Sequence, residues 1–142
     1  MELTIGMELP SGAAWKHAFD APIPGGGEVN GGLGRADAFV EIMEAAGAGP
    51  DQVTVAVVVH GKAVFDVVNA TRHVSEVEGS DHPNADLVER ILDAGGEIWV
   101  CARSAAWQNV GDDDLLPGVR FAPSAMTAHA ELQRRGFSLN PY

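Results

Sequence analysis

The segment VTVAVVV, Val53–Val59, gives the clearest structural signal in this 142-residue sequence. β-Branched residues fill six of its seven positions, and no charged residue interrupts it. Such a continuous run is typical of a strand that is buried on both faces, as in a parallel sheet covered by helices. We therefore expect a central strand here, which ends at the following pair, His60 and Gly61.

Strand-like and helical segments alternate on both sides of this run. Trp15, His17 and Phe19 recur with period two ahead of Pro22, which indicates a short strand. The alternation predicts one three-layer α/β/α domain over residues 1–142, with a mainly parallel sheet of about five strands. Further strands are expected at 97–101, 119–123 and 137–141, helices at 35–47, 62–69, 84–96, 104–111 and 124–136, and irregular chain at 1–12, 25–34, 74–83 and 112–119.

The composition is acidic. Against 20 Asp and Glu there are 9 Lys and Arg, so the net charge is −11. A surface with this charge repels phosphate backbones and anionic lipids, and we expect neither nucleic acid nor a membrane as a partner. No apolar run approaches the ~20 residues that cross a bilayer.

The single cysteine and the first residues bear on the compartment. One cysteine forms no internal disulfide and no thiolate metal cage, and MELTIGMELPSG, residues 1–12, lacks the basic and apolar parts of a secretory signal. Both observations predict a cytoplasmic protein. A chain whose signal peptide had already been removed would have the same sequence.

Several reactive or polar residues follow the expected strands directly. In open parallel sheets, ligands bind outside the carboxyl ends of the strands, where the following helices begin. The candidate site therefore lies at this edge. Its expected catalytic groups are Cys101 and His60, and its expected ligand-binding groups are Gly61, Arg103, Ser104 and Ser124.

Two interpretations of Cys101 are open. Free cysteines are most often buried and inert, which favours a small apolar residue that fills the core. A thiol at a strand end, before a helix expected to begin near Ser104, would instead meet the positive end of that helix and unpaired N–H groups. Both favour the thiolate, the form that attacks sulfur, and Arg103 adds to this if it faces the same side.

His60 also has two interpretations. It could take a proton from a thiol or hold an anionic ligand, or it could be a strand-end histidine that is hydrogen-bonded to backbone. A one-residue change of register would turn Cys101 to the opposite face of the sheet. Trp99 and Trp107, which flank the cysteine, indicate core or interface packing, or an aromatic wall around a reactive sulfur.

Motifs for cofactor chemistry are absent from the sequence. GGGEVNGGLG, residues 25–34, does not match G-x-G-x-x-G and is expected to be a mobile connection rather than an anion-binding nest. There is no P-loop and no G-x-S-x-G elbow. We expect no metal and no cofactor. No second acidic cluster is present to complete a metal site with Asp112–Asp114. The spacing typical of metal ligands is not found at the other histidines, His17, His73, His82 and His129.

The second half of the chain carries a distinctive combination of residues. VVVHG at 57–61 is followed by a strand-end Cys101 with Ser104 and then by a series of short matches: Asp114-Leu115, Pro117-Gly118-Val119, Pro123-Ser124, Glu131-Leu132-Gln133, Gly136-Phe137 and Pro141. From Val53 to Pro141 the sequence resembles the DsrE/DsrF-like (YchN-like) proteins of sulfur relay, especially their small stand-alone members. VNGGLGRADAFVEIM, residues 29–43, also looks like the first helix of that family.

The resemblance implies a three-layer α/β/α fold, assembly into trimers or hexamers, and a cysteine that carries a persulfide sulfur, whose position Cys101 occupies. It implies a sulfurtransferase-like carrier with a sulfur donor or acceptor protein as partner. The alternative is a non-catalytic homo-oligomer that binds a small anion, with Cys101 as pocket lining. Apolar residues at Trp107, Leu115 and Leu116 favour self-association. Arg103 and Gln108-Asn109 depart from the family pattern and leave the partner open.

Overall fold

The computed structural model describes residues 1–76 and 82–142 and contains a five-stranded sheet in the order β4-β3-β2-β1-β5. Every pair of neighbouring strands is parallel, and β2 is the middle strand. The prediction of a parallel α/β sheet with a central Val53–Val59 strand is confirmed. The strands are β1 (Trp15–Ala21), β2 (Val53–Val59), β3 (Glu97–Cys101), β4 (Arg120–Ala122) and β5 (Ser138–Leu139).

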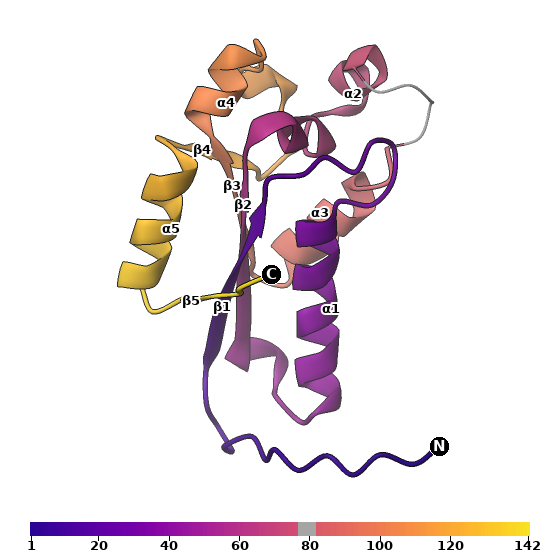
Figure 1. Cartoon of the computed structure of the whole chain (residues 1–142), viewed down its shortest axis with the longest axis vertical. Coiled ribbons are helices and arrows are strands. Elements are labelled where there is room, and N and C mark those ends of the chain that lie inside the picture. The colour runs from indigo at the N-terminus through magenta and orange to yellow at the C-terminus, as the bar shows by residue number, and fades with distance from the viewer. Residues whose placement is uncertain (77–81) are drawn as a thin grey trace.

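Helices cover both faces of this sheet (Figure 1). Helices α1 (Gly31–Ala45) and α3 (Ala85–Asp93) lie on one face, and α5 (Ala125–Arg134) lies on the other. The short helices α2 (Ala70–Glu76) and α4 (Ala102–Trp107) lie at the end of the sheet where the strands finish. Short 3-10 turns occur at Pro50–Gln52, Gly61–Asp66 and Asp112–Asp114.

The core is divided by β2 into two parts. Val55, Val57 and Val59 pack into a cluster with residues of α1 and α3, whereas Ala56 and Val58 pack into a cluster with residues of α5. Successive side chains of a strand point to opposite faces, so an apolar residue at nearly every position is what a doubly covered strand requires. This explains why no polar alternation is seen in β2.

Several helices differ in their boundaries from the expectation. Gly31–Gly34 belong to α1 and not to a mobile loop, because Asn30 caps the helix: its side-chain oxygen accepts the N–H of Leu33 at 3.1 Å. Helix α4 begins at Ala102, directly after the strand, and not near Ser104. The helix predicted at 62–69 is a 3-10 turn over Gly61–Asp66.

The polar segment expected to be irregular at 74–83 is helical at its start. Helix α2 extends to Glu76, held in part by the Arg72–Glu76 ion pair at 3.0 Å. Residues 77–81 lie outside the described residues. In the two described ranges, no helix is long and apolar enough to span a membrane.

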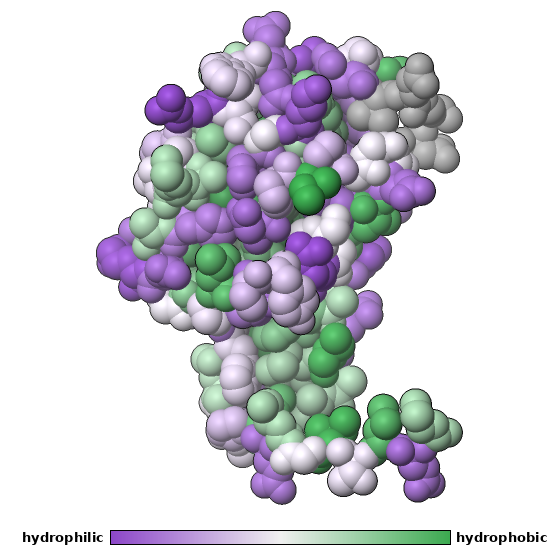
Figure 2. Space-filling model, viewed as in Figure 1, coloured by the Kyte–Doolittle hydropathy of each residue, from purple (hydrophilic) through white to green (hydrophobic). Residues whose placement is uncertain are grey.

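Residues 1–10 form neither helix nor strand and extend away from the sheet (Figure 1). Figure 2 shows hydrophobic side chains along this extension. They belong to Met1, Leu3, Ile5 and Met7, each at least 72% exposed.

Gly32 fixes the distance between α1 and β1. A Cβ atom at this position would lie 2.7 Å from Ala21 Cβ and 2.9 Å from the carbonyl oxygen of Asp20. We expect Gly32→Ala to lower the free energy of unfolding by roughly 1–3 kcal/mol, because two backbones must separate. Gly34→Ala in the same helix is the matched control, since its Cβ meets only Val29 Cγ1 at 3.4 Å. Denaturant titrations that rank the two variants equally would contradict this.

Candidate functional site

The register of the sheet brings the predicted site residues together. Val59 pairs with Val100, so the next residues, His60 and Cys101, lie side by side at the carboxyl edge. Cys101 also pairs with Ala122 of β4, which leads to the start of α5. A cavity of about 380 Å³ at this edge is lined by five of the six predicted residues: His60, Cys101, Arg103, Ser104 and Ser124.

Cys101 is one of the buried apolar residues, but it lies apart from the two clusters that pack against β2. Its exposed fraction is 6%. Burial raises the pKa of the thiol. Hydrogen bonds from the Ser104 hydroxyl and from the backbone N–H groups of Ser104, Ala125 and Arg103 together lower it by more, so the pKa is below its ordinary value. The sulfur therefore lies where donors from the first turns of α4 and α5 converge, an arrangement that favours the thiolate.

The Ser104 hydroxyl is oriented by Gly61. The N–H of Gly61 donates to Ser104 Oγ at 2.9 Å, which leaves the hydroxyl hydrogen free to point at the sulfur. Gly61 has φ +60°, in the left-handed region that glycine adopts without strain. Gln108 holds the same turn, since its Nε2 donates to the carbonyl oxygen of Gly61 at 2.8 Å. Gly61 thus contacts the site through Ser104 and does not itself line the cavity.

The ring of His60 is bound by a carboxylate that the sequence did not single out. Asp20 Oδ1 lies 3.0 Å from His60 Nε2 and 2.8 Å from His129 Nε2. Burial raises the pKa of Asp20, but hydrogen bonds from His129 and His60 lower it more, and the pKa is below its ordinary value. The only sequence signal for Asp20 was its place near the end of the first strand, and His129 carried none.

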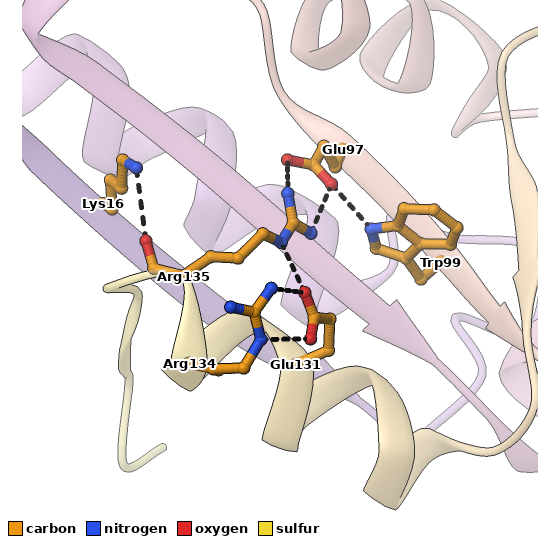
Figure 3. Close-up of polar contacts among 6 residues, drawn as sticks. All are labelled: Lys16, Glu97, Trp99, Glu131, Arg134 and Arg135. Carbon is orange, nitrogen blue, oxygen red and sulfur yellow. Dashed lines mark hydrogen bonds and ion pairs between the residues drawn. The ribbon is translucent and has the colours of Figure 1, made fainter.

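The far end of α5 is anchored to the sheet by ion pairs (Figure 3). Arg135 donates to both oxygens of Glu97, at 3.1 and 2.9 Å, and Glu97 also accepts the indole N–H of Trp99 at 2.9 Å. Lys16 donates to the carbonyl oxygen of Arg135 at 3.2 Å. These contacts hold α5 against the sheet, and thereby set the position of its first turn beside the cavity.

The other chemical candidates do not form sites. Within residues 1–76 and 82–142, no group of three or more His, Cys, Asp or Glu side chains has a geometry that could hold a metal ion. The acidic run Asp112–Asp114 is a 3-10 turn in which Asp114 accepts the N–H of Gly111 at 2.8 Å. Trp99 packs on the α5 side of the sheet, whereas Trp107 is 95% exposed at the cavity rim.

Removal of the Ser104 hydroxyl should make the thiolate form of Cys101 less stable. We expect Ser104→Ala to raise the pKa of Cys101, so that alkylation by iodoacetamide at pH 7 becomes slower and its pH profile moves to higher pH. Ser75→Ala is a suitable control, because in the described part of the chain Ser75 Oγ bonds only the carbonyl oxygen of Arg72 in α2. Identical profiles for Ser104→Ala and the parent protein would show that this hydroxyl does not act on the sulfur.

Comparison with known proteins agrees with the fold. The chain matches the MTH1491 protein of Methanobacterium thermoautotrophicum, described as of unknown function, with a TM-score of 0.60 and 17% identity over 89% of this chain and 97% of that one. It matches YchN of E. coli with a TM-score of 0.58 and 11% identity over 88% and 96%. No curated protein sequence matches significantly. The model of the DsrE/DsrF-like family matches residues 34–140, and the chain therefore belongs to the DsrE/DsrF-like family.

Proposed function

We propose that this protein is a sulfur carrier with sulfurtransferase-like activity, in which Cys101 accepts and passes on a persulfide sulfur. The observation that carries the proposal is the setting of Cys101: it lines a cavity together with Arg103, Ser104 and Ala125, whose polar groups lower the pKa of the thiol. Membership of a family that is generally linked to sulfur relay supports it.

The reaction is a pair of displacements at sulfur. The Cys101 thiolate attacks the outer sulfur of a donor R–S–SH, forms the persulfide Cys101–S–SH, and expels R–S⁻. An acceptor thiolate then attacks the outer sulfur, takes it as R′–S–SH, and returns Cys101 to the thiolate. Both steps transfer a sulfur atom without net oxidation, so they need no cofactor.

The charge of the cavity suits an anionic sulfur compound. The whole chain has a net charge of −11, but the Cys101 cavity differs from the rest of the surface. His60 and Arg103 line it, and among the described residues no Asp or Glu does. Arg103, and His60 in its protonated form, would hold the charge of a persulfide or of a small anionic donor such as thiosulfate. Ser124, which caps α5 by accepting the N–H of Thr127 at 3.0 Å, would contribute its hydroxyl.

The second candidate function is anion binding without sulfur transfer. The observation in its favour is the 6% exposure of Cys101, which leaves little of the side chain open to a large partner. In that case the cavity would bind the same anions, and replacement of the thiol would change neither binding nor stability by more than a small amount. A donor protein could transfer sulfur to Cys101 only if its reactive sulfur reached into the cavity.

Mass spectrometry of the intact protein tests the proposal. The protein is incubated either with thiosulfate and a rhodanese or with cysteine and a desulfurase. We expect a gain in mass of one sulfur atom that is removed by a small thiol. Because Cys101 is the only cysteine, no other thiol can account for the gain. A protein that remains unmodified with both donors, while an added sulfur-accepting control protein is loaded, contradicts the proposal.

We further propose that residues 1–142 are one DsrE-like unit, with an N-terminal arm at 1–12, and that it assembles into a trimer or a dimer of trimers. The exposed indole of Trp107 supports assembly, since a monomer leaves it in water beside the cavity rim. We expect Trp107→Glu to lower the mass measured by sedimentation, whereas Met126→Gln, a change at another exposed rim residue, separates a general effect of polarity from an effect of the indole. A parent protein of 14.9 kDa at micromolar concentration would refute assembly.

A further inference from the structure

Three side chains from separate elements meet at one carboxylate oxygen beside the Cys101 cavity. Asp20 comes from β1, His60 follows β2, and His129 comes from α5. Asp20 Oδ1 is within 3.0 Å of Nε2 of both imidazoles, and the side chains of Asp20, His60 and His129 are 39%, 29% and 20% exposed. We refer to Asp20, His60 and His129 as the histidine–carboxylate cluster.

The alternation of side chains places this cluster and the thiol on the same face of the sheet. Ala18, Val58 and Trp99 pack on the α5 side. Two positions further along each strand, Asp20, His60 and Cys101 therefore also face that side. The cluster and the thiol thus share the carboxyl edge of one face, below the first turns of α5.

The hydrogen bonds determine where the protons of the imidazoles are. An ionised carboxylate only accepts hydrogen bonds, so Nε2 of His60 and Nε2 of His129 must both carry hydrogen. In neutral His60 the lone pair is then on Nδ1. This atom has no hydrogen-bond partner in the described part of the chain, and His60 is one of the residues that line the cavity.

We propose that Asp20 and His129 are positioning residues for His60, and that His60 Nδ1 is the acid–base group of the Cys101 cavity. The role in transfer rests on the sulfur-carrier function proposed above. Asp20 fixes the tautomer of His60 and stabilises its protonated form. His129 donates to the same oxygen, weakens it as an acceptor, and so limits how strongly Asp20 holds the proton of His60.

The proton balance of the discharge step shows why such a group is useful. The acceptor thiol R′–SH gives its proton to His60 Nδ1, and its sulfur attacks the outer sulfur of Cys101–S–SH. The bond between the two persulfide sulfurs breaks, its electron pair stays on Cys101 as the thiolate, and R′–S–SH leaves. The imidazolium then faces the new thiolate and the Asp20 carboxylate until solvent removes the proton. Among the residues that the structure describes, the ionisable groups that join His60 in the cluster or line its cavity are Asp20, His129, Cys101 and Arg103.

Nitrogen NMR of the histidine side chains tests the positioning without any sulfur donor. In the parent protein we expect His60 to be the Nε2–H tautomer. Asp20→Asn should raise the share of the Nδ1–H tautomer of His60, because a neutral amide holds hydrogen on Nε2 less strongly than a carboxylate does. His129→Phe should strengthen the hydrogen bond from His60 Nε2 and move the signal of that proton downfield, because Asp20 Oδ1 then accepts from His60 alone. His129→Gln, which keeps an N–H donor, should restore most of the parent behaviour.

Two controls separate this effect from a general change of charge or fold. Asp37→Asn removes the same charge from α1, where Asp37 pairs with Arg90 at 3.1 Å, and should leave His60 unchanged. His17, paired with Ser138 Oγ at 2.7 Å, serves as a reference within each spectrum. Equal His60 tautomer populations and equal Nε2–H signals in the parent, Asp20→Asn and His129→Phe proteins would overturn the assignment of Asp20 and His129.

The second measurement is the pH profile of persulfide discharge to a small thiol. We expect Asp20→Asn to slow discharge at pH 7 about tenfold or more and to change the shape of the profile. A rate and a profile that stay the same while the tautomer of His60 changes would overturn the acid–base role of His60. If the parent protein never loads sulfur, the sulfur-carrier function and the acid–base role both fail, and the NMR result still decides whether Asp20 and His129 position His60.

Discussion

Replacement of Cys101 by serine should abolish the loading of persulfide completely. The oxygen of serine is not a nucleophile toward sulfane sulfur at neutral pH, and the chain has no second thiol. The volume is nearly conserved, and the surrounding N–H donors can bond a hydroxyl as well as a sulfur. We therefore expect the Cys101→Ser protein to keep its fold, its melting temperature within a few degrees, and its assembly state.

The measurement combines intact-mass analysis after incubation with a sulfur donor and thermal unfolding by circular dichroism. Cys101→Ala provides a second variant without any hydroxyl, and it should also fail to load. If Cys101 only fills space and those donors do not reach it, the serine variant would bury a hydroxyl without a partner, at a cost of roughly 1–3 kcal/mol. A serine variant that melts markedly lower, from a parent protein that never accepts sulfur, would show that the thiol is packing.

Replacement of His73 by leucine should stabilise the protein, and more so at acidic pH. His73 in α2 is 1% exposed, its ring stacks on His82 with centroids 4.1 Å apart, and neither ring nitrogen has a hydrogen-bond partner among the described residues. A buried polar group without a partner costs about 1–3 kcal/mol, and leucine of similar volume removes that cost. At pH 7.5 we expect a gain in unfolding free energy of about that size.

The pH dependence follows from the lowered pKa of His73. Burial lowers this pKa, the neighbouring His82 lowers it further, and the buried carboxyl of Asp66 opposes both. The unfolded chain, with a histidine pKa near 6.5, therefore takes up a proton at a higher pH than the folded protein does. Stability is lost as the pH falls below about 6.5, and the loss stops below the folded pKa.

Denaturant titrations at pH 7.5 and pH 5 measure both effects. The advantage of His73→Leu over the parent protein should grow as the pH falls, because leucine has no proton to gain. His17→Gln is the matched control, since the ring of His17 is hydrogen-bonded to Ser138 and is not part of the His73–His82 stack. An advantage that is constant between the two pH values would show that His73 does not titrate differently in the folded and unfolded states.

The strands of this protein are determined by local sequence. Val53–Val59 and Glu97–Cys101 were predicted with the bounds that the structure shows, because a β-branched or apolar run between polar turns has one favourable conformation when both faces are covered. The alternation of such runs with helical segments also placed His60 and Cys101 at one edge, since parallel strands share a direction. The first residues of the helices were harder to predict from the sequence. Asn30, for example, caps α1 through a side-chain contact that periodicity does not reveal.

The chemistry of the edge was decided by tertiary structure. Asp20 and His129 are 109 residues apart in sequence, and only the packing of α5 against the sheet brings them into contact. The direction of the Cys101 pKa depends on a competition between burial, which raises it, and donors from two helix starts, which lower it. Residue type and position in the sequence specify neither the depth of burial nor the aim of those N–H groups. The sequence by itself therefore determined the sheet and the edge at which the thiol lies, whereas the balance of forces on its proton arises only when α4 and α5 converge there.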